Sequence, residues 1–295
     1  MGFYPKVGRA SDKAKAVALA AGTGAAVCLA AGAVAGGVSA LLEQRHVRVY
    51  PHAKYGPLLV YQVRDEEGAW VRVMRQGGVY QSATYVDERR FSLVFEYYRA
   101  FDHVFDTESL SNPMRRMLML GGGGFAYPKH VVSSFPDASI DVCEADPLVI
   151  RVARKHFFVD DLIQQYDTER SRRLNIIAAR AQDYLAGACG MDYDVIINDC
   201  FQGAQAAGGH DDAETCLAVK RALRPGGVYA LNVVDEEGAY GPAVEAAVEA
   251  ASAAFSCVYV IPCPDSRFSE SCNVMVAACD SACSFGGVEW ARCEA

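Results

Sequence analysis

Glycines 121–124 and Glu144 each stand at the end of an apolar run. The four glycines follow the apolar run MLML (117–120), and Glu144 ends the next apolar run. A glycine turn lets a ligand approach the backbone because no Cβ atoms stand in its way. A carboxylate at the end of the following strand can accept both hydroxyl hydrogens of a ribose. The pattern predicts ribose binding by Glu144, and the alternative is a solvated carboxylate at a strand end.

A second carboxylate, Asp199, ends a further apolar run, YDVIIN at 193–198. In open α/β sheets, ligands bind at the carboxyl ends of the strands, so we expect Asp199 to face the same ligand. A carboxylate there can accept a proton from an amine nucleophile, or orient the amine toward an electrophilic carbon. The alternative is that Asp199 caps the loop that follows it.

The order of apolar runs predicts the fold that positions these residues. We expect strands at 117–120, 139–145, 174–178, 193–199, 227–234 and 257–261, and a late edge strand at 273–279. We expect helices around 125–134, 147–157, 212–223 and 240–254. Strands that alternate with helices of this length predict a doubly wound α/β domain with a mostly parallel sheet.

The preceding segment predicts a small antiparallel β region. The runs PLLVYQV, AWVRVMR and GVYQSATY alternate apolar and polar residues and are separated by DEEG and GG turns. The next stretch, 87–105, has aromatic and apolar residues at helical spacing, which predicts a helix. The chain thus divides into an N-terminal segment (1–43), the β region (47–86), a nucleotide-binding domain (87–283) and a tail (284–295).

Residues 16–42 carry no charged side chain and follow a basic stretch. As a helix they would extend about 40 Å, against a bilayer core of about 30 Å. Three interpretations stay open: a membrane anchor, a helix that is soluble or covered by a partner, and a cleaved signal sequence. The anchor is our leading expectation, with the catalytic domain in the cytoplasm.

Composition excludes some partners. The chain has 28 Lys and Arg residues against 36 Asp and Glu residues, a net charge of −8, which argues against nucleic-acid binding. The same balance is compatible with a cationic small substrate. The 11 cysteines include no CxxC pair, and Cys279 and Cys283 come nearest to a ligand spacing. We therefore expect no metal site, and reduced buried thiols.

Together, four motifs resemble the spermidine synthase family of aminopropyltransferases: MLMLGGGG, DVCEADPLVIRVARKHF, YDVIINDCF and ALRPGGVYALNVV. That family shares the fold of class I S-adenosylmethionine methyltransferases, and the likeness extends from about Tyr55 to about Ala278. The resemblance implies S-adenosylmethionine or its decarboxylated form as co-substrate, and a small-molecule amine or other acceptor. A homodimer is a possible assembly.

The resemblance also implies roles for single residues. The cofactor site would contain Gly121, Gly122 and Gly123 against the methionine-derived portion, Glu144 on the ribose, and the neighbouring Ala145 and Asn198. Asp199 would be the base that activates the amine. Tyr55 and Gln202 would contact the acceptor.

The chain departs from the family's motif at several polar positions. Gly124 replaces an Asp of the glycine turn, Gln202 replaces a second acid, and Gly56 replaces a Gln. Ala179 and Arg180 replace a Gly-Asp pair that contacts adenine, and the family's Tyr-Gln-Glu has no clear match in RRFSLVFEYY. A diammonium substrate needs carboxylates to offset its desolvation, so we expect a degenerate polyamine pocket.

Two other functions stay open: a methyltransferase acting on a small molecule, and a non-catalytic nucleotide-binding domain held at a membrane.

The loop 203–214 lies where the family has a gate over the site, and His210, Asp211 and Asp212 can reach a ligand from it. The alternative is that the two acids begin the next helix.

Overall fold

The computed structural model describes residues 45–106, 115–202, 205–206, 212–235, 237–238, 241–263, 272–283, 285 and 291–293. The predicted anchor at 16–42 and most of the predicted gate, including His210 and Asp211, lie outside these residues. Among the described helices, none is both long and apolar enough to cross a membrane.

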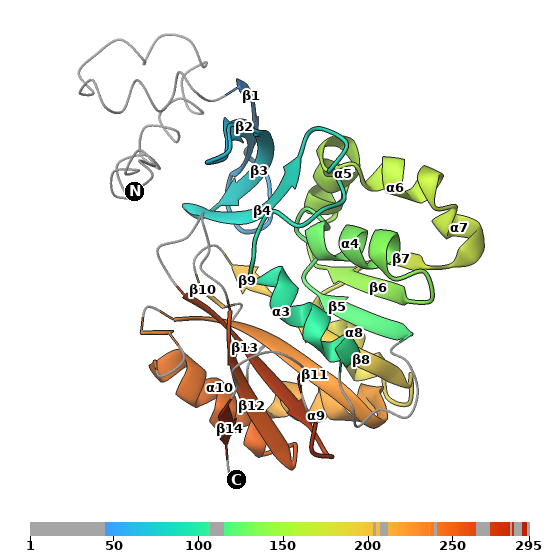
Figure 1. The fold of residues 1–295 in the computed structure, drawn as a ribbon, viewed down its shortest axis with the longest axis vertical. Helices are drawn as coiled ribbons and strands as arrows, with labels where there is room; N and C mark the ends of the chain where they lie inside the picture. Colours follow the sequence, from blue (N-terminus) through green and yellow to red (C-terminus); the bar gives the residue numbers. More distant parts are fainter. Residues whose placement is uncertain are drawn as a thin grey trace.

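A large mixed sheet forms the centre of the described chain, in the strand order β14-β12-β13-β11-β8-β5-β6-β7 (Figure 1). The parallel strands are β5 (Arg116–Leu120), β6 (Ser139–Glu144), β7 (Leu174–Ala178), β8 (Tyr193–Asn198) and β11 (Leu223–Asp235). The chain order reverses between β5 and β8, because β6 and β7 lie on one side of β5 and β8 lies on the other. The predicted doubly wound α/β fold is confirmed.

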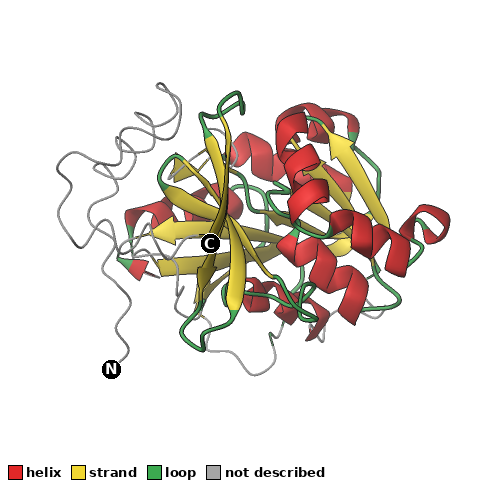
Figure 2. Cartoon of the chain, turned by 90° about the horizontal axis from the view of Figure 1, so that it is seen from above, coloured by secondary structure: helices red, strands yellow, loops and turns green. Residues whose placement is uncertain are grey.

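Helices cover both faces of this sheet (Figure 2). They are α4 (Ala126–Ser134), α5 (Pro147–His156), α6 (Val159–Gln165), α7 (Thr168–Ser171), α8 (Ala181–Gly187), α9 (Ala213–Ala222) and α10 (Pro242–Ser252). Successive side chains of a strand point to opposite faces. Met119 of β5 therefore packs in one core with Val131 of α4, and its neighbour Leu120 packs in the other with Leu185 of α8.

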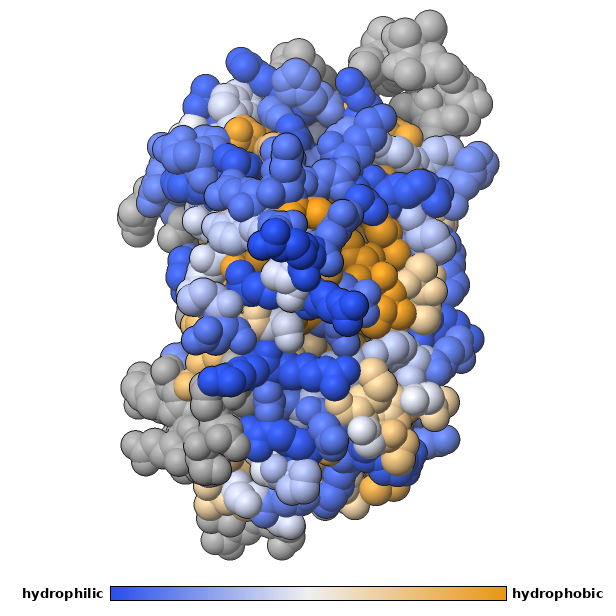
Figure 3. Space-filling view, turned by 90° about the vertical axis from the view of Figure 1, so that its right-hand side faces the viewer, coloured by the Kyte–Doolittle hydropathy of each residue, from blue (hydrophilic) through white to orange (hydrophobic). Residues whose placement is uncertain are grey.

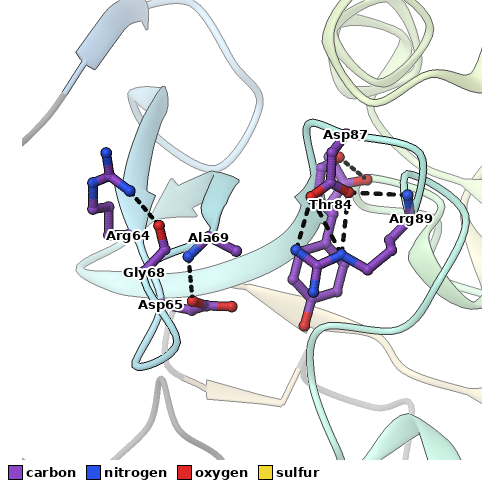
Figure 4. Close-up of polar contacts among 8 residues, drawn as sticks. Arg64, Asp65, Gly68, Ala69, Thr84, Asp87 and Arg89 are labelled. Carbon is purple, nitrogen blue, oxygen red and sulfur yellow. Dashed lines mark hydrogen bonds and ion pairs between the residues drawn. The ribbon is translucent and has the colours of Figure 1, made fainter.

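An antiparallel sheet precedes this domain, as predicted. It contains β1 (Arg45–Tyr50), β2 (Leu58–Arg64), β3 (Trp70–Gln76) and β4 (Val79–Tyr85), in sequence order. In the turn between β2 and β3, Asp65 accepts the Ala69 N–H at 2.8 Å (Figure 4). Leu58 and Met74 of this sheet pack against Val152 of α5. The small sheet is thereby fixed beside the helix that follows Glu144.

Local sequence sets where two helices begin. Asp146 accepts the Leu148 N–H at 2.8 Å as the N-cap of α5, and Pro147 occupies the first turn. Asp212 accepts the Thr215 N–H at 2.8 Å at the start of α9. Of the two interpretations of Asp212, the helix-opening one is confirmed.

The predicted helix at 87–105 is wrong over most of its length. Helical structure is confined to α3 (Tyr98–Asp102) and the 3-10 helix η2 (His103–Asp106). The Asp87 carboxylate accepts the Arg89 N–H at 2.9 Å (Figure 4), which favours a turn. The Arg90 carbonyl, which a helix would use internally, accepts from the Thr84 hydroxyl (2.8 Å) and the Lys129 ammonium (2.9 Å). The aromatic spacing reflects core packing of an irregular segment.

The predicted edge strand at 273–279 is also wrong in its place. Strand β13 (Cys272–Cys279) lies between β11 and β12 (Cys257–Pro262) and is antiparallel to both. Its burial on both faces, from Asn273 to Cys279, explains the continuous apolar run. The outer position belongs to β14 (Ala291–Cys293), which pairs with β12.

Figure 3 views the side of the molecule on which α5, α6 and α7 lie in Figure 1. This face is largely hydrophilic, with a hydrophobic area near its middle. Arg154 of α5 and Asp160 of α6 are exposed and form an ion pair of 2.6 Å. These helices therefore present polar side chains to solvent while Ala153 and Leu162 are buried.

Phe101 anchors α3 in the core. It is 1% exposed, and its ring centroid lies 5.4 Å from that of Tyr127 and 6.1 Å from that of Tyr98. We expect Phe101→Ala to lower the free energy of unfolding by about 3–5 kcal/mol, because it leaves a cavity. Equilibrium denaturation measures this change. Leu217→Ala, at a side chain that is 43% exposed on α9, should change it by less than about 0.5 kcal/mol. Equal losses in the two variants would contradict the placement of Phe101 in the core.

Candidate functional site

The glycine turn and Asp199 meet at the carboxyl ends of β5 and β8. Gly121 has a φ of +91°, and its N–H donates to the Cys143 carbonyl at 2.9 Å. The Asp199 N–H donates to the Leu120 carbonyl at 2.9 Å. A Cβ at Gly121 would collide with the Asp199 carbonyl group, its carbon lying 2.9 Å away. Gly121 is thus required both by its backbone conformation and by this close approach.

Glu144 is turned into the glycine turn. Its Oε2 accepts the N–H groups of Gly122 (2.9 Å) and Gly123 (3.1 Å), and its Oε1 accepts the Asp146 N–H at 2.9 Å. Burial raises the pKa of Glu144, and the three backbone donors oppose that rise. The alternative of a solvated strand-end carboxylate is therefore wrong. Each carboxylate oxygen can accept two hydrogen bonds, so Oε1 retains capacity for a hydroxyl.

Three neutral donors surround the Asp199 carboxylate. Its Oδ2 accepts from the hydroxyls of Tyr97 and Tyr98, at 3.2 Å each, and its Oδ1 accepts from Asn232 Nδ2 at 2.7 Å. Burial raises the pKa of Asp199, while these hydrogen bonds act in the opposite direction. Burial also raises the pKa of both tyrosines, so they donate as neutral hydroxyls. The arrangement holds a carboxylate with an increased proton affinity.

Sequence reasoning missed Tyr97, Tyr98 and Asn232. The tyrosine pair belongs to the segment wrongly predicted as one long helix, and nothing in its spacing indicates that the two hydroxyls converge on Asp199. Asn232 gave a usable signal, since it is a polar residue in the middle of the buried run ALNVV. Buried polar side chains need partners, so its position in a central strand indicates a polar neighbour.

The remaining predicted site residues differ in their burial and contacts. Asn198 is 1% exposed, and its amide donates to the Tyr229 hydroxyl at 2.9 Å. Tyr229 belongs to the core that contains Leu120. Ala145 is half-buried beside Glu144. Tyr55 is half-buried next to Lys54, whose N–H donates to Asp146 Oδ2 at 2.6 Å.

Gln202 lies in β9 (Phe201–Gln202), which pairs with β10 (Gln205–Ala206), and its side chain is outside the described residues. The binding roles of Asn198, Ala145, Tyr55 and Gln202 stay predictions.

Within the described ranges, no group of three or more His, Cys, Asp or Glu side chains is arranged to hold a metal ion. Cys279 and Cys283 are buried, and their sulfur atoms lie 3.2 Å apart.

Comparison with known proteins identifies the family. The family model of the spermine/spermidine synthase domain matches residues 95–263, from the segment that carries Tyr97 and Tyr98 to the end of β12. The chain belongs to the spermine/spermidine synthase family. The matched residues include the glycine turn, Glu144, Asp199 and Asn232.

Curated relatives of this family match over part of their length. A polyamine aminopropyltransferase of Vibrio vulnificus (strain CMCP6) is 26% identical over 167 residues, which are 56% of this chain and 52% of the relative. Spermidine synthase 2 of Arabidopsis thaliana is 32% identical over 120 residues, which are 41% of this chain and 34% of the relative. The chain thus spans about half the length of the first relative and a third of the second.

Solved structures share the fold over most of the chain. The crystal structure of a probable spermidine synthase from Corynebacterium glutamicum ATCC 13032 has a TM-score of 0.63 and 22% identity, covering 80% of this chain and 81% of the other. A spermidine synthase in complex with the transition state analogue AdoDATO has a TM-score of 0.57 and 18% identity, with coverages of 81% and 73%. The predicted fold of class I methyltransferase type is confirmed.

Gly124, the position at which the resemblance predicts an acid, is tightly packed. A Cβ at Gly124 would lie 2.6 Å from Ser82 Oγ and 2.8 Å from Phe157 Cδ1. The turn is therefore packed directly against β4 and the end of α5, without room for the acidic side chain of the family motif.

We expect Gly124→Ala to destabilise the protein, because Ser82 and Phe157 must move. Pairing it with Ser82→Gly, which removes one of the two contacts, should recover part of the loss. Thermal unfolding followed by circular dichroism measures both variants. Gly187→Ala is the matched control, since a Cβ there meets nothing within 4 Å. A neutral Gly124→Ala would show that the turn is not tightly packed.

The raised pKa of Asp199 predicts a pH-dependent stability. Because the folded state holds this proton more tightly than the unfolded state, stability falls as pH rises above the unfolded pKa of about 3.9. Asp199→Asn removes this penalty. We expect the stability of the variant relative to the natural chain to increase as the pH rises above about 4. Denaturant titrations across this range measure the difference, and a difference independent of pH would contradict the prediction.

Proposed function

We propose that this member of the spermine/spermidine synthase family is a transferase that binds decarboxylated S-adenosylmethionine or S-adenosylmethionine and transfers a group to a small-molecule amine. The observation that carries the proposal is the Asp199 carboxylate beside Gly121, held by Tyr97, Tyr98 and Asn232. A positioned base next to a glycine cradle is what amine transfer requires of a protein.

The residues around the turn fit such a co-substrate. Gly121 and Gly123 have positive φ angles, so the turn exposes backbone without Cβ atoms, and Glu144 Oε1 retains capacity for a ribose hydroxyl. When bound, the sulfonium supplies an electrophilic carbon and a leaving group. The names of the relatives, polyamine aminopropyltransferase and spermidine synthase, favour aminopropyl as the transferred group.

In the proposed reaction, Asp199 accepts a proton from the acceptor ammonium and so frees the nitrogen lone pair for attack. Its raised pKa increases its affinity for that proton. Tyr97 and Tyr98 hold Oδ2 in place and stay protonated, because burial raises their own pKa values. Asn232 holds Oδ1.

We propose further that the polyamine pocket is degenerate. The described partners of Asp199 are hydroxyls and an amide, which are neutral, and Gly124 replaces an acid of the family motif. A second ammonium group would find few carboxylates to offset its desolvation. An acceptor with a single amine, bound beside the tyrosine rings, fits these residues better than a diamine.

The loss of the acid at Gly124 also favours a second candidate, methyl transfer from S-adenosylmethionine to a small molecule. The non-catalytic alternative, membrane attachment through 16–42, a cytoplasmic location and a homodimer stay predictions of the sequence.

Calorimetry with decarboxylated S-adenosylmethionine, S-adenosylmethionine and methylthioadenosine tests the nucleotide site. We expect at least one of them to bind, and Glu144→Gln to weaken it by about 1.5–3 kcal/mol through loss of a charge-assisted hydrogen bond. With a bound donor, we expect amine transfer to fall by about 10²–10⁴-fold in Asp199→Asn, the range for a lost acid–base group.

Asp192→Asn is the matched control, because Asp192 is exposed at the other end of the same strand and its φ of +57° suits Asn equally. Absence of binding by all three nucleotides would refute both transferase candidates. Binding without turnover of any mono-, di- or triamine would refute amine transfer alone.

A further inference from the structure

We propose that Asn273 is a positioning residue that fixes the Asn232 amide with its NH₂ group toward Asp199. Asn273 Nδ2 donates to Asn232 Oδ1 at 3.0 Å, and Asn232 Nδ2 donates to Asp199 Oδ1 at 2.7 Å. The inference rests on the proposed role of Asp199 as the base. It extends the site from the end of β8, through β11, to β13.

The strand register brings these three side chains together. Leu231 of β11 pairs with Asn198 of β8, so the next residues, Asn232 and Asp199, come level with one another. On β13, Met275 pairs with Asn232, which makes Asn273 a diagonal neighbour on the same face, within reach of a side chain. Asn232 is 5% exposed and Asn273 is 7% exposed, so water competes little for their amide groups.

The chemistry of an amide gives a direction to the hydrogen bonds that run from Asn273 through Asn232 to Asp199. A side-chain amide has one acceptor oxygen and one donor nitrogen, and an ionised carboxylate only accepts. Asn232 therefore serves Asp199 only when its nitrogen faces the carboxylate, and its oxygen must then find a donor elsewhere. Asn273 is that donor. Without it, the buried oxygen loses its partner, and an inverted amide would place oxygen against the carboxylate, which disfavours the ionised form.

Other titratable groups near Asp199 do not take the place of Asn273 in orienting the Asn232 amide. In the described part of the chain, the charge of Asp199 acts on Tyr97 just before α3, Tyr98 in α3, Cys200 after β8 and Cys263 after β12. Burial raises the pKa of each, that of Cys263 to about 12. All four are neutral where a carboxylate titrates, so the amide chain is free to set the orientation at Oδ1.

The test is the titration of Asp199 in protein labelled with ¹³C at Asp carboxyl carbons, with the signal assigned by its loss in Asp199→Asn. We expect Asn273→Leu to move the titration midpoint upward, because Asn232 no longer holds its donating orientation. In the Asn232→Ala background, the same substitution should produce no further shift. This measurement needs no turnover, so it stays informative if the proposed transfer reaction fails.

Val274→Ala is the matched control for damage to β13, since Val274 is buried on the opposite face of the same strand. It should leave the midpoint unchanged. Asn273→Ala serves as a second variant if the leucine does not fold. The proposal is overturned if the Asn273 variants titrate as the natural chain does, if their shift persists in Asn232→Ala, or if Val274→Ala produces it too. Where amine transfer is measured, its acid limb should move with the NMR midpoint.

Discussion

The contact between Gly121 and the backbone of Asp199 is the constraint on which the site depends. It lies at the seam where the chain order of the sheet reverses, and it brings the end of β5 against the end of β8 without a side chain between them. A larger residue at this turn would separate the two strands, and the glycine turn and the carboxylate would no longer share one end of the sheet. The backbone hydrogen bond from Asp199 to Leu120 holds the same seam closed.

Around this seam, two buried carboxylates are held by neutral donors. Backbone N–H groups satisfy Glu144, and two hydroxyls and an amide satisfy Asp199. Neutral donors stabilise the negative charge less than a cation would, so burial dominates and the pKa of each carboxylate is raised. For Asp199 this is the direction that suits the proposed base, whereas for Glu144 it follows from burial, which its hydrogen bonds to the turn oppose.

Much of the fold follows from the sequence because its signals are local. Apolar runs bounded by turns located the strands around Leu120, Glu144 and Asn198, and the acids at 211–212 indicated the start of α9. Where the prediction failed, the deciding interaction was distant. The turns at 87–97 depend on Lys129, which contacts Arg90 from another element, and the place of β13 depends on the strand it enters beside. The short helices α6, α7 and α8 were not predicted, because they have too few turns for a clear periodicity.

The residues of the site also divide into those that the local sequence indicates and those that depend on distant contacts. Residues that act through their own strand end, such as Glu144 and Asp199, could be selected from their positions. Tyr97, Tyr98 and Asn273 could not, because each reaches Asp199 only through tertiary packing that places separate segments on one face of the sheet.

The insertion of β13 between β11 and β12 has a consequence for the order in which the protein is assembled during synthesis. Both neighbours leave the ribosome before β13 does, and each exposes an unpaired strand edge until it arrives. Until β13 is made, the facing edges of β11 and β12 stay unpaired, and association with other chains competes with correct closure of the sheet. Asn273 enters with the strand that fills this gap, so the hydrogen bonds that lead to Asp199 are completed in the same step that joins β11 to β12.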